Sequence, residues 1–420
     1  MKSMIRIVGR GKQATSKESN RGDGSEGIAA GLNGRVELIQ ALIPLGLEAV
    51  EDVLQQEVTA LAGERYARGG GQPGCARWGR QTGSVYLADH KVSVAVPRVR
   101  DRVREQEVPL VSYQALREPR RAEEAALRKI LKGLSCRDYE SCVEPVAEAF
   151  GLKASSLSRR FKRASAWKLQ ELRERDLSSY DIVAVFLDGK TFGEDQMVIA
   201  LGVTLEGNKV ILGFVQTATE NEAVCSTFLR ELMERGLKID QGLLCVIDGA
   251  KGLRKAVDNV FAQKAAVQRC TWHKRENVVR YLATNLQPTF RRKLQAAYEK
   301  PTYVQAKASL MKVRSELSPI NESAVASLEE GLEDTLTLHR LGLFQELGES
   351  FKTTNCLENL NSLVGQRTDK VDCWKNAEQK HRWLATTLLD IEPRLRKVRG
   401  HRQLVRLRAA LQQRGLDAVA

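Results

Sequence analysis

The sequence predicts a mixed α/β fold: a mixed sheet with helices on both faces, interrupted by an all-helical insertion and preceded by a mainly helical region. Three observations predict it. Apolar strands alternate with helical segments between residues 180 and 287. Residues 288–352 lose the strand pattern and are charged and helix-forming. Helical spacing of apolar residues dominates the chain before residue 175.

The N-terminal part divides into a lead and a small folded region. Residues 1–34 are polar and rich in Gly, Ser and Lys, which predicts a disordered lead. Residues 35–120 are expected to form an N-terminal helix followed by a small hairpin. The helix covers residues 35–62, a Gly- and Arg-rich loop covers 63–80, and the alternating run 81–98 predicts a hairpin that ends at Pro97.

Residues 121–175 resemble a helix-turn-helix DNA-binding domain. A helix is expected to continue to Phe150, Gly151 turns the chain, and Ser155 opens the next helix. Residues 151–170 contain six basic residues and no acid. Small hydroxyls near a helix start, with arginines behind them, suit base edges and phosphates in a major groove. The candidate DNA contacts are Ser156, Arg159, Arg160, Lys162 and Arg163. The alternative is a helical hairpin with a solvated basic face.

A sheet domain follows, its first part at residues 180–287. Strands are expected at 182–187, 197–205, 210–215, 243–247 and 265–269, with helices at 221–235, 252–261 and from about 272. Residues 288–352 form the helical insertion, and 353–390 the second part of the domain. Residues 391–420 are expected to be a basic C-terminal helix, either a solvated face or one that follows phosphates.

Composition narrows the classes of function. The chain has 420 residues, a formal net charge of +14 and 5% aromatic residues. A strongly basic chain commonly meets a polyanion such as nucleic acid, although a basic enzyme surface without such a partner is the alternative. Few aromatic residues disfavour a single-strand binder built on stacking.

Cysteine usage and hydropathy indicate the compartment. The eight cysteines are scattered and do not form a disulfide framework, which predicts a reducing environment. No apolar run is long enough to span a bilayer, and residues 1–10 lack the features of a signal peptide. We therefore expect a cytoplasmic protein that meets nucleic acid directly.

Two aspartates stand after apolar runs. Asp188 follows residues 182–187 and Asp248 follows residues 243–247, and each precedes a glycine. Ligands collect at the carboxyl ends of strands in sheets of this type, so both carboxylates are expected to face one site. The alternative is that each Asp-Gly pair makes a turn. Glu358 is expected in the first turn of a helix, where a glutamate is usually a capping or dipole residue.

Three carboxylates suit phosphodiester chemistry. Two divalent ions about 3.5–4 Å apart can activate an attacking oxygen and stabilise the leaving one. Mg²⁺ prefers oxygen ligands and keeps several waters, so a few carboxylates suffice. The cofactor expected at Asp188, Asp248 and Glu358 is therefore Mg²⁺ or Mn²⁺, with two ions per active site.

Cys270 and His273 have the spacing of half a zinc site. No second pair lies at suitable spacing nearby, so structural zinc is not expected. We expect Cys270 to pack in the core and His273 to orient a phosphate or a carboxylate.

Together these segments resemble the Mutator-type bacterial insertion-sequence transposases, over residues 65–393. The matching pieces are Leu187–Lys190, Ile247–Leu253, Cys270–Lys274, Thr353–Asn361, Arg367-Thr368, Trp374 and Arg382-Trp383. The resemblance implies a ribonuclease-H-like catalytic domain whose DDE triad, Asp188, Asp248 and Glu358, holds the metal, with Cys270 and His273 as auxiliary residues. It also implies double-stranded DNA as partner, both terminal inverted repeats and target, and a location near the bacterial nucleoid.

One position departs from a common pattern. Many such enzymes have Lys or Arg seven residues after the glutamate, whereas this chain has Gly365, and Arg367 is the nearest basic residue. Lys190, Lys251 and Arg367 complete the set of candidate DNA contacts.

The resulting hypothesis is metal-dependent cleavage at the ends of an insertion sequence, followed by attack of the freed 3′-hydroxyl on target DNA. Because two ends must be joined, a homodimer is expected. The alternatives are a catalytically silent, domesticated transposase that regulates by binding DNA, and a metal-dependent nuclease of the same fold. A serine or tyrosine recombinase would need a nucleophile among arginines, and no such constellation stands out.

Overall fold

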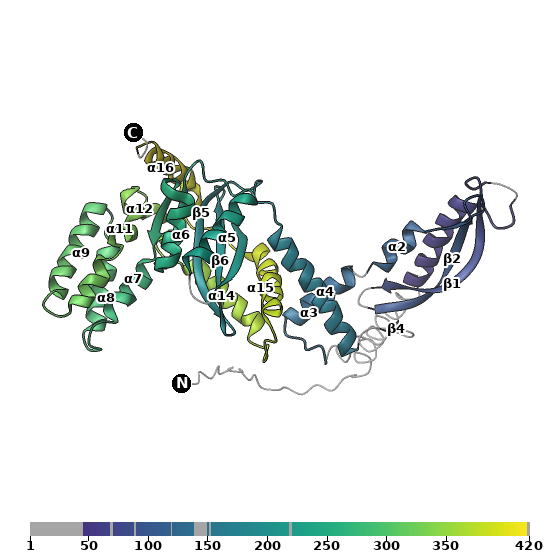
Figure 1. Ribbon diagram of the computed structural model, residues 1–420, viewed down its shortest axis with the longest axis horizontal. Helices are drawn as coiled ribbons and strands as arrows, with labels where there is room; N and C mark the ends of the chain where they lie inside the picture. The colour runs from purple at the N-terminus through teal and green to yellow at the C-terminus, as the bar shows by residue number, and fades with distance from the viewer. Residues whose placement is uncertain are drawn as a thin grey trace, which may run out of the picture. The chain divides into compact units, whose positions relative to one another are not determined.

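The computed structural model describes residues 45–67, 70–87, 90–118, 120–137, 149–150, 153–217 and 221–417. The chain divides into two compact units (Figure 1). Unit 1 comprises Met1–Ala122 and Val143–Gly151, and unit 2 comprises Glu123–Cys142 and Leu152–Ala420. The predicted disordered lead at residues 1–34 lies outside the described residues. None of the helices in the described ranges is long and apolar enough to cross a membrane.

Unit 1 is a small sheet packed on helices. Residues 45–62 are helical, and α2 spans Val111–Arg117. The strands are β1 (Cys75–Leu87), β2 (His90–Asp101), β3 (Gln106–Val108) and β4 (Ala149–Phe150). β2 pairs antiparallel with β1, β3 and β4, and Val50, Leu54, Val85 and Val96 lie in the core. The predicted hairpin is confirmed.

The end of that hairpin was predicted wrongly. β2 continues through Pro97 to Asp101, and β1 begins inside the segment expected to be a loop. Pro97 lies opposite Arg80, where the register between β1 and β2 shifts. Proline has no N–H for the ladder, so a strand tolerates it at such an irregularity.

The expected helix up to Phe150 is also wrong at its last two residues. Ala149 and Phe150 form β4, which pairs with Lys91 and Val92 of β2. The rest of the predicted turn region, residues 138–148 and 151–152, lies outside the described residues. The flanking helices are α3 (Arg120–Leu131) and the long α4 (Ala154–Arg173). α4 packs on α15 (Ala377–Ile391), where Phe161 contacts Trp383 with ring centroids 4.8 Å apart.

Unit 2 contains the predicted mixed sheet, which is confirmed. Its strands are β5 (Ile182–Phe192), β6 (Asp195–Thr204), β7 (Lys209–Thr217), β8 (Leu243–Ile247) and β9 (Ala265–Arg269). Their order is β7-β6-β5-β8-β9. β5, β6 and β7 pair antiparallel, whereas β5, β8 and β9 are parallel. β5 therefore lies at the centre, with a partner on each side.

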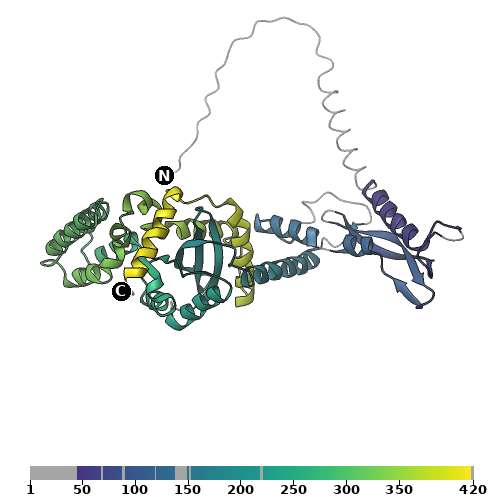
Figure 2. The ribbon, with the colours of Figure 1, turned by 90° about the horizontal axis from the view of Figure 1, so that it is seen from above.

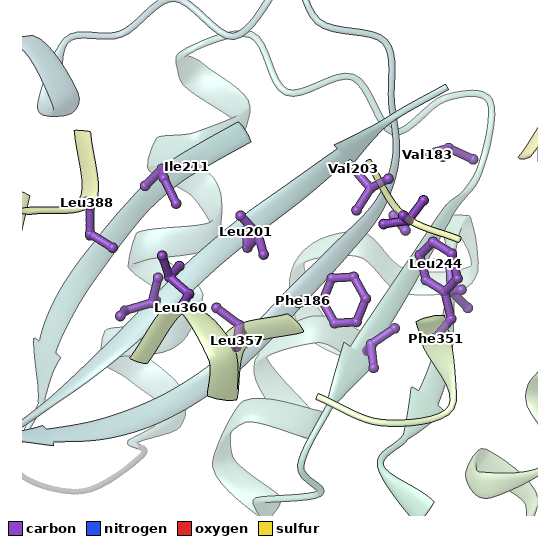
Figure 3. Close-up of a cluster of buried hydrophobic side chains, with 14 of the residues drawn as sticks. Val183, Phe186, Leu201, Val203, Ile211, Leu244, Phe351, Leu357, Leu360 and Leu388 are labelled. Carbon is purple, nitrogen blue, oxygen red and sulfur yellow. The ribbon is translucent and has the colours of Figure 1, made fainter. Parts of the chain in front are cut away.

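Helices cover both faces of this sheet (Figure 2). α5 (Glu222–Glu234) and α6 (Lys251–Phe261) bury one face with residues such as Val185 and Leu187. α13 (Phe344–Phe351), α14 (Asn355–Thr368), α15 and α16 (Leu404–Asp417) cover the other. Figure 3 shows Phe186 and Leu201 of the sheet against Leu357, Leu360 and Phe351 of these helices.

The insertion is helical, as predicted. α7 (Thr271–Val279) leads into α8 (Gln287–Tyr298), α9 (Tyr303–Leu317), α10 (Glu322–Glu329), α11 (Leu332–Thr335) and α12 (Thr337–Arg340). Their apolar residues form a separate core that runs from Val278 to Leu336. Short 3₁₀ turns occupy Ala262–Lys264, Glu392–Arg394 and His401–Gln403.

Much of the basic C-terminal segment holds the fold together. Arg408 of α16 is only 7% exposed and donates to the carbonyls of Gly242 and Ile182 and to the carboxylate of Asp181. Arg406 pairs with Glu346 at 2.8 Å. The expected C-terminal helix over 391–420 is shorter than predicted, because α16 begins only at Leu404, after two 3₁₀ turns. Its buried Arg408 binds carbonyl groups at one end of the sheet and is available neither to solvent nor to phosphates.

Candidate active site

Asp188 and Asp248 are neighbours on parallel strands. Leu187 of β5 pairs with Ile247 of β8, and each aspartate is the next residue along its strand direction. Neighbouring strands lie about 4.8 Å apart, and residues at the same register point to the same face. That face is the one of Phe186 and Val246, which α14 covers. The sheet thus brings the two carboxylates together, as the sequence predicts.

Asp188 differs from the prediction in one respect. It lies inside β5, not after its end, because the strand continues to Phe192. Asp188 pairs with Ile199 of β6, and its side chain is 7% exposed. The ladder with β6 therefore holds its backbone, one residue beyond the last pair with β8. The run of apolar residues ends at Asp188 because the buried side chains give way to the polar residues of the site, whereas the strand continues to Phe192.

Asp248 begins a tight loop between β8 and α6. Its Oδ1 accepts a hydrogen bond from the backbone N–H of Ala250 at 3.0 Å. Gly249 has φ +104°, a conformation that side chains rarely adopt. A Cβ at Gly249 would lie 2.0 Å from Nε of Arg269. The glycine is therefore needed for its backbone angle and for the close approach of this guanidinium.

Arg269 links the Asp248 loop to the insertion. It is 7% exposed, and one Nη donates to the carbonyl of Glu330 at 3.0 Å. A Cβ at Gly331 would lie 2.6 Å from Nη1 of Arg269. Lys274 is fully buried and donates to the same Glu330 carbonyl, and burial lowers the pKa of its ammonium to about 8. Sequence reasoning missed both cations, although Arg269 is the last residue of a buried strand and Lys274 directly follows the Cys270–His273 segment.

Glu358 lies in the first turn of α14 on its exposed side. Leu357, Leu360 and Val364 of that helix are buried against the sheet face that carries the aspartates. Lys190, two residues after Asp188 on the same strand, donates to the backbone carbonyl of Asn361 in α14. The helix that carries the glutamate is thus anchored across the aspartate face.

The three carboxylates interact electrostatically. Burial raises the pKa of Asp188, and the charges of Asp248 and Glu358 raise it further, while His273 opposes them; the result is about 7. A group whose charged form is unfavourable in a cleft is a candidate functional residue. The rise in the pKa of Asp188 comes mainly from burial and next from the like charges of its neighbours.

His273 stands beside the carboxylates. Burial lowers its pKa, but the hydrogen bond with Cys270 and the charges of Cys270, Asp188 and Asp248 raise it to about 9. Its Nδ1 lies 3.4 Å from Oγ1 of the buried Thr354, and that hydroxyl lies 3.5 Å from Oε1 of Glu358. Thr354 therefore connects the histidine with the glutamate, a role that no sequence signal had indicated. Cys270 is fully buried, as expected.

The donor set fits a hard divalent cation in part. Asp188 and Asp248 offer carboxylate oxygens side by side, and a cation would relieve the repulsion that raises the pKa of Asp188. Across the described ranges, however, no group of three Asp, Glu, His or Cys side chains is arranged to hold a metal ion. The two aspartates fit the ion, and Glu358 does not complete the set in this arrangement.

The other candidate DNA contacts have diverse environments. Lys251 is exposed and lies 3.6 Å from Glu330, and Arg367 is half-buried and lies 3.6 Å from Asp390. On α4, Arg160 is 5% exposed, and Arg163 pairs with the buried Glu123. The other three candidates on that helix are more accessible, and Arg159 and Lys162 are exposed while Ser156 is half-buried.

Comparison with known proteins gives one consistent result. The family model described as "Transposase, Mutator family" matches residues 30–396. The transposase for insertion sequence element IS905 of Lactococcus lactis is 27% identical over 352 residues, covering 81% of this chain and 86% of that protein. The transposase for element IS256 in transposon Tn4001 of Staphylococcus aureus is 25% identical and covers 71% of this chain and 77% of that protein. The transposase for element ISRM5 of Rhizobium meliloti is 27% identical, with 80% and 85% covered.

Proposed function

Since this chain belongs to the Mutator family of transposases, we propose that it cuts and joins DNA at the ends of an insertion sequence, with Asp188, Asp248 and Glu358 as catalytic carboxylates. The observation that carries the proposal is that Asp188 in β5 and Asp248 directly after β8 each follow the paired residues Leu187 and Ile247, on the face that α14 covers. A mixed sheet with one carboxylate on its central strand and another directly after the adjacent parallel strand also suits a ribonuclease-H-like domain, and we propose that fold for unit 2.

The carboxylates would hold two Mg²⁺ or Mn²⁺ ions, which supply Lewis acidity and an activated oxygen nucleophile for phosphodiester cleavage and transfer. Asp188 and Asp248 provide a fixed pair of ligands because paired strands hold Asp188 and a tight loop holds Asp248. Glu358 is exposed at the start of α14, so its side chain has room to change rotamer. We propose that Glu358 turns toward the aspartates when DNA is bound.

His273 contributes a positive charge next to the aspartates. With a pKa of about 9, its imidazole is protonated at neutral pH and donates hydrogen bonds. In the resting protein it offsets the negative charge of Asp188 and Asp248. With DNA bound, the same group is placed to orient a phosphate oxygen or one of the carboxylates.

Recognition of the terminal inverted repeats is proposed for unit 1 and α4. On α4 the exposed Arg159 and Lys162 are the better candidates for DNA contact, because Arg160 is buried and Arg163 is paired with Glu123. Two element ends must be held together for joining, so we propose a homodimer on DNA.

A strand-transfer assay tests the catalytic proposal. The wild-type protein, Asp188→Asn and the control Asp240→Asn are incubated with a duplex of the element end, a target plasmid and Mg²⁺. We expect joined products from the wild type and from the control, whose exposed carboxylate pairs with Lys264. We expect none from Asp188→Asn, although it should bind the duplex normally.

The same products separate the rival functions. Joining by Asp188→Asn would contradict the assignment of this residue. Cut but unjoined strands from the wild type would indicate a nuclease. Binding without any cleavage by the wild type would indicate a silent, DNA-binding regulator.

A further inference from the structure

An exposed indole ring stands beside the carboxylate site. Trp272 lies in the first turn of α7, and 45% of it is exposed. Its ring meets the imidazole of His273 edge to face, with centroids 4.8 Å apart and an interplanar angle of 85°. The edge contact with His273 leaves much of the ring accessible.

The large aromatic side chains beneath the neighbouring helices are packed instead. Phe186 stacks on Phe351 with centroids 5.5 Å apart, and Trp374 contacts both Phe192 and Trp383. An exposed indole forgoes the hydrophobic stabilisation that these rings gain by burial. Trp78 and Trp167 are exposed to a similar degree, but Trp272 contacts His273 and so lies beside the carboxylates, where a ligand could cover it.

The backbone that carries Trp272 is held firmly. The N–H of Cys270 donates to the carbonyl of Ile247 at 2.7 Å. The N–H and the hydroxyl of Thr271 both donate to the carbonyl of Lys352, at 2.9 and 3.1 Å. Two residues after Trp272, the buried Lys274 donates to the carbonyl of Glu330. The ring is therefore presented from a fixed position, which lowers the entropy lost when a flat ligand stacks on it.

The position of His273 shows that the ring of Trp272 lies near the carboxylates. The imidazole lies near Thr354, which contacts Glu358, and is close enough to Asp188 and Asp248 to feel their charges. A group that stacks on Trp272 is therefore next to the phosphate on which these residues would act. The exposed ammonium of Lys251, two residues beyond Gly249, adds positive charge to the same end of the sheet.

We propose that Trp272 stacks on an unpaired nucleobase of the DNA end, beside the reacting phosphate. The inference rests on the proposed function, because it takes the carboxylates to act on DNA. A base inside a duplex has both faces covered by its neighbours, so a protein ring can stack on it only after the base leaves the helix. Stacking would hold such a base out and thereby fix the register of the strand at the site.

Binding assays without metal test this directly. The probes are a short DNA duplex with one unpaired 2-aminopurine and the same duplex fully paired, both in EDTA. Stacking of one base corresponds to a preference for the unpaired probe of roughly fivefold to 100-fold. We expect this preference, with quenching of 2-aminopurine, for the wild type and for the control Tyr281→Ala, which removes an aromatic ring of 52% exposure that has no proposed DNA contact. Trp272→Ala should lose both signals, and Trp272→Phe should keep part of them.

Three outcomes would overturn the inference. Trp272→Ala could keep the preference for the unpaired probe, or it could lower the affinity for both probes by the same factor. It could also change only the oligomeric state, which would make the ring part of a protein interface. Failure here is distinguishable from failure of the proposed function. If the wild type shows no preference while Asp188→Asn still abolishes joining, only the role of Trp272 falls. If the preference holds but joining is absent, the catalytic proposal falls and the base site stands.

Discussion

Replacing Asp188 by Asn should make the metal-free protein more stable at alkaline pH. The carboxyl is 7% exposed, and burial, together with the charges of Asp248 and Glu358, raises its pKa from 3.8 to about 7. A rise of roughly three pKa units corresponds to about 4 kcal/mol, since each unit is worth about 1.36 kcal/mol. An amide of the same shape carries no charge, so most of this cost disappears in the variant.

The sign of the effect depends on pH in a defined way. Below pH 4 the carboxyl is protonated in both the folded and the unfolded chain, and the two proteins should differ little. Between pH 4 and 7 the unfolded chain loses its proton while the folded one keeps it, so the wild type loses stability. Above pH 7 the difference is complete. The advantage of Asp188→Asn should therefore be large at pH 8 and small at pH 4.5.

Urea unfolding in EDTA, followed by tryptophan fluorescence, measures this difference. Four of the five tryptophans lie in unit 2, so the signal reports mainly the unit that contains Asp188. The control is Asp240→Asn, an exposed carboxyl whose pKa is lowered by its hydrogen bond with Lys264, which should gain no stability. A loss of stability in Asp188→Asn at pH 8, or a gain of equal size at both pH values, would refute the reasoning.

Three further predictions follow from the same site and from α4. Mg²⁺ at 100 times its dissociation constant should stabilise the wild type at pH 8 by about 2.7 kcal/mol and leave Asp188→Asn nearly unchanged; equal stabilisation of both in the urea assay would exclude Asp188 as a ligand. Gly249→Ala should lower the free energy of unfolding more than Gly342→Ala. Both positions have positive φ, but only at Gly249 would the new Cβ meet a neighbour, Nε of Arg269 at 2.0 Å. We expect a loss of about 1 kcal/mol for Gly342→Ala and at least about 2 kcal/mol for Gly249→Ala, and equal losses would show that Arg269 moves freely. Arg159→Ala and Lys162→Ala should each lower the dependence of DNA affinity on salt concentration by about one counterion, without loss of stability. Arg160→Ala should instead destabilise the protein, since Arg160 is only 5% exposed. An unchanged salt dependence in the first two variants would exclude Arg159 and Lys162 from the DNA interface.

The sequence predicted most of unit 2 because its local signals agree with the tertiary structure. Every strand expected between 182 and 269 exists, since continuous apolar runs are buried on both faces of the sheet. The family resemblance was also correct, as the matched family model shows. The prediction for Asp188 stopped the strand at the first polar residue, whereas the ladder with β6 continues to Phe192. An apolar run indicates a buried strand, but a buried polar residue within the strand interrupts that run, so the sequence pattern ends before the strand does.

Long-range contacts explain what the sequence could not predict. β4 exists because Ala149 and Phe150 pair with Val92 and Lys91 of β2, nearly 60 residues earlier in the chain, which overrides any local helical preference. Arg160 and Arg163 looked like equivalent members of a basic face, but one is buried and the other pairs with Glu123. Charge patterns give the number of cations on a helix, and only packing decides which of them remain available for DNA.

The carboxylate site has a fixed part, Asp188 and Asp248, and an adjustable part, Glu358. This difference bears on when the enzyme becomes active. Asp188 is held by its ladder with β6, directly after the last residue that pairs with β8, and Asp248 lies in a tight loop that Arg269 ties to the insertion. The backbone therefore keeps the two carboxylates side by side. Glu358 lies on the exposed side of a helix turn, and its carboxylate lies 3.5 Å from the hydroxyl of Thr354. A cation held by two carboxylates binds more weakly than one held by three. A site that completes itself only when DNA draws Glu358 inward would therefore remain inactive until an element end occupies it, which would limit cleavage of unrelated DNA.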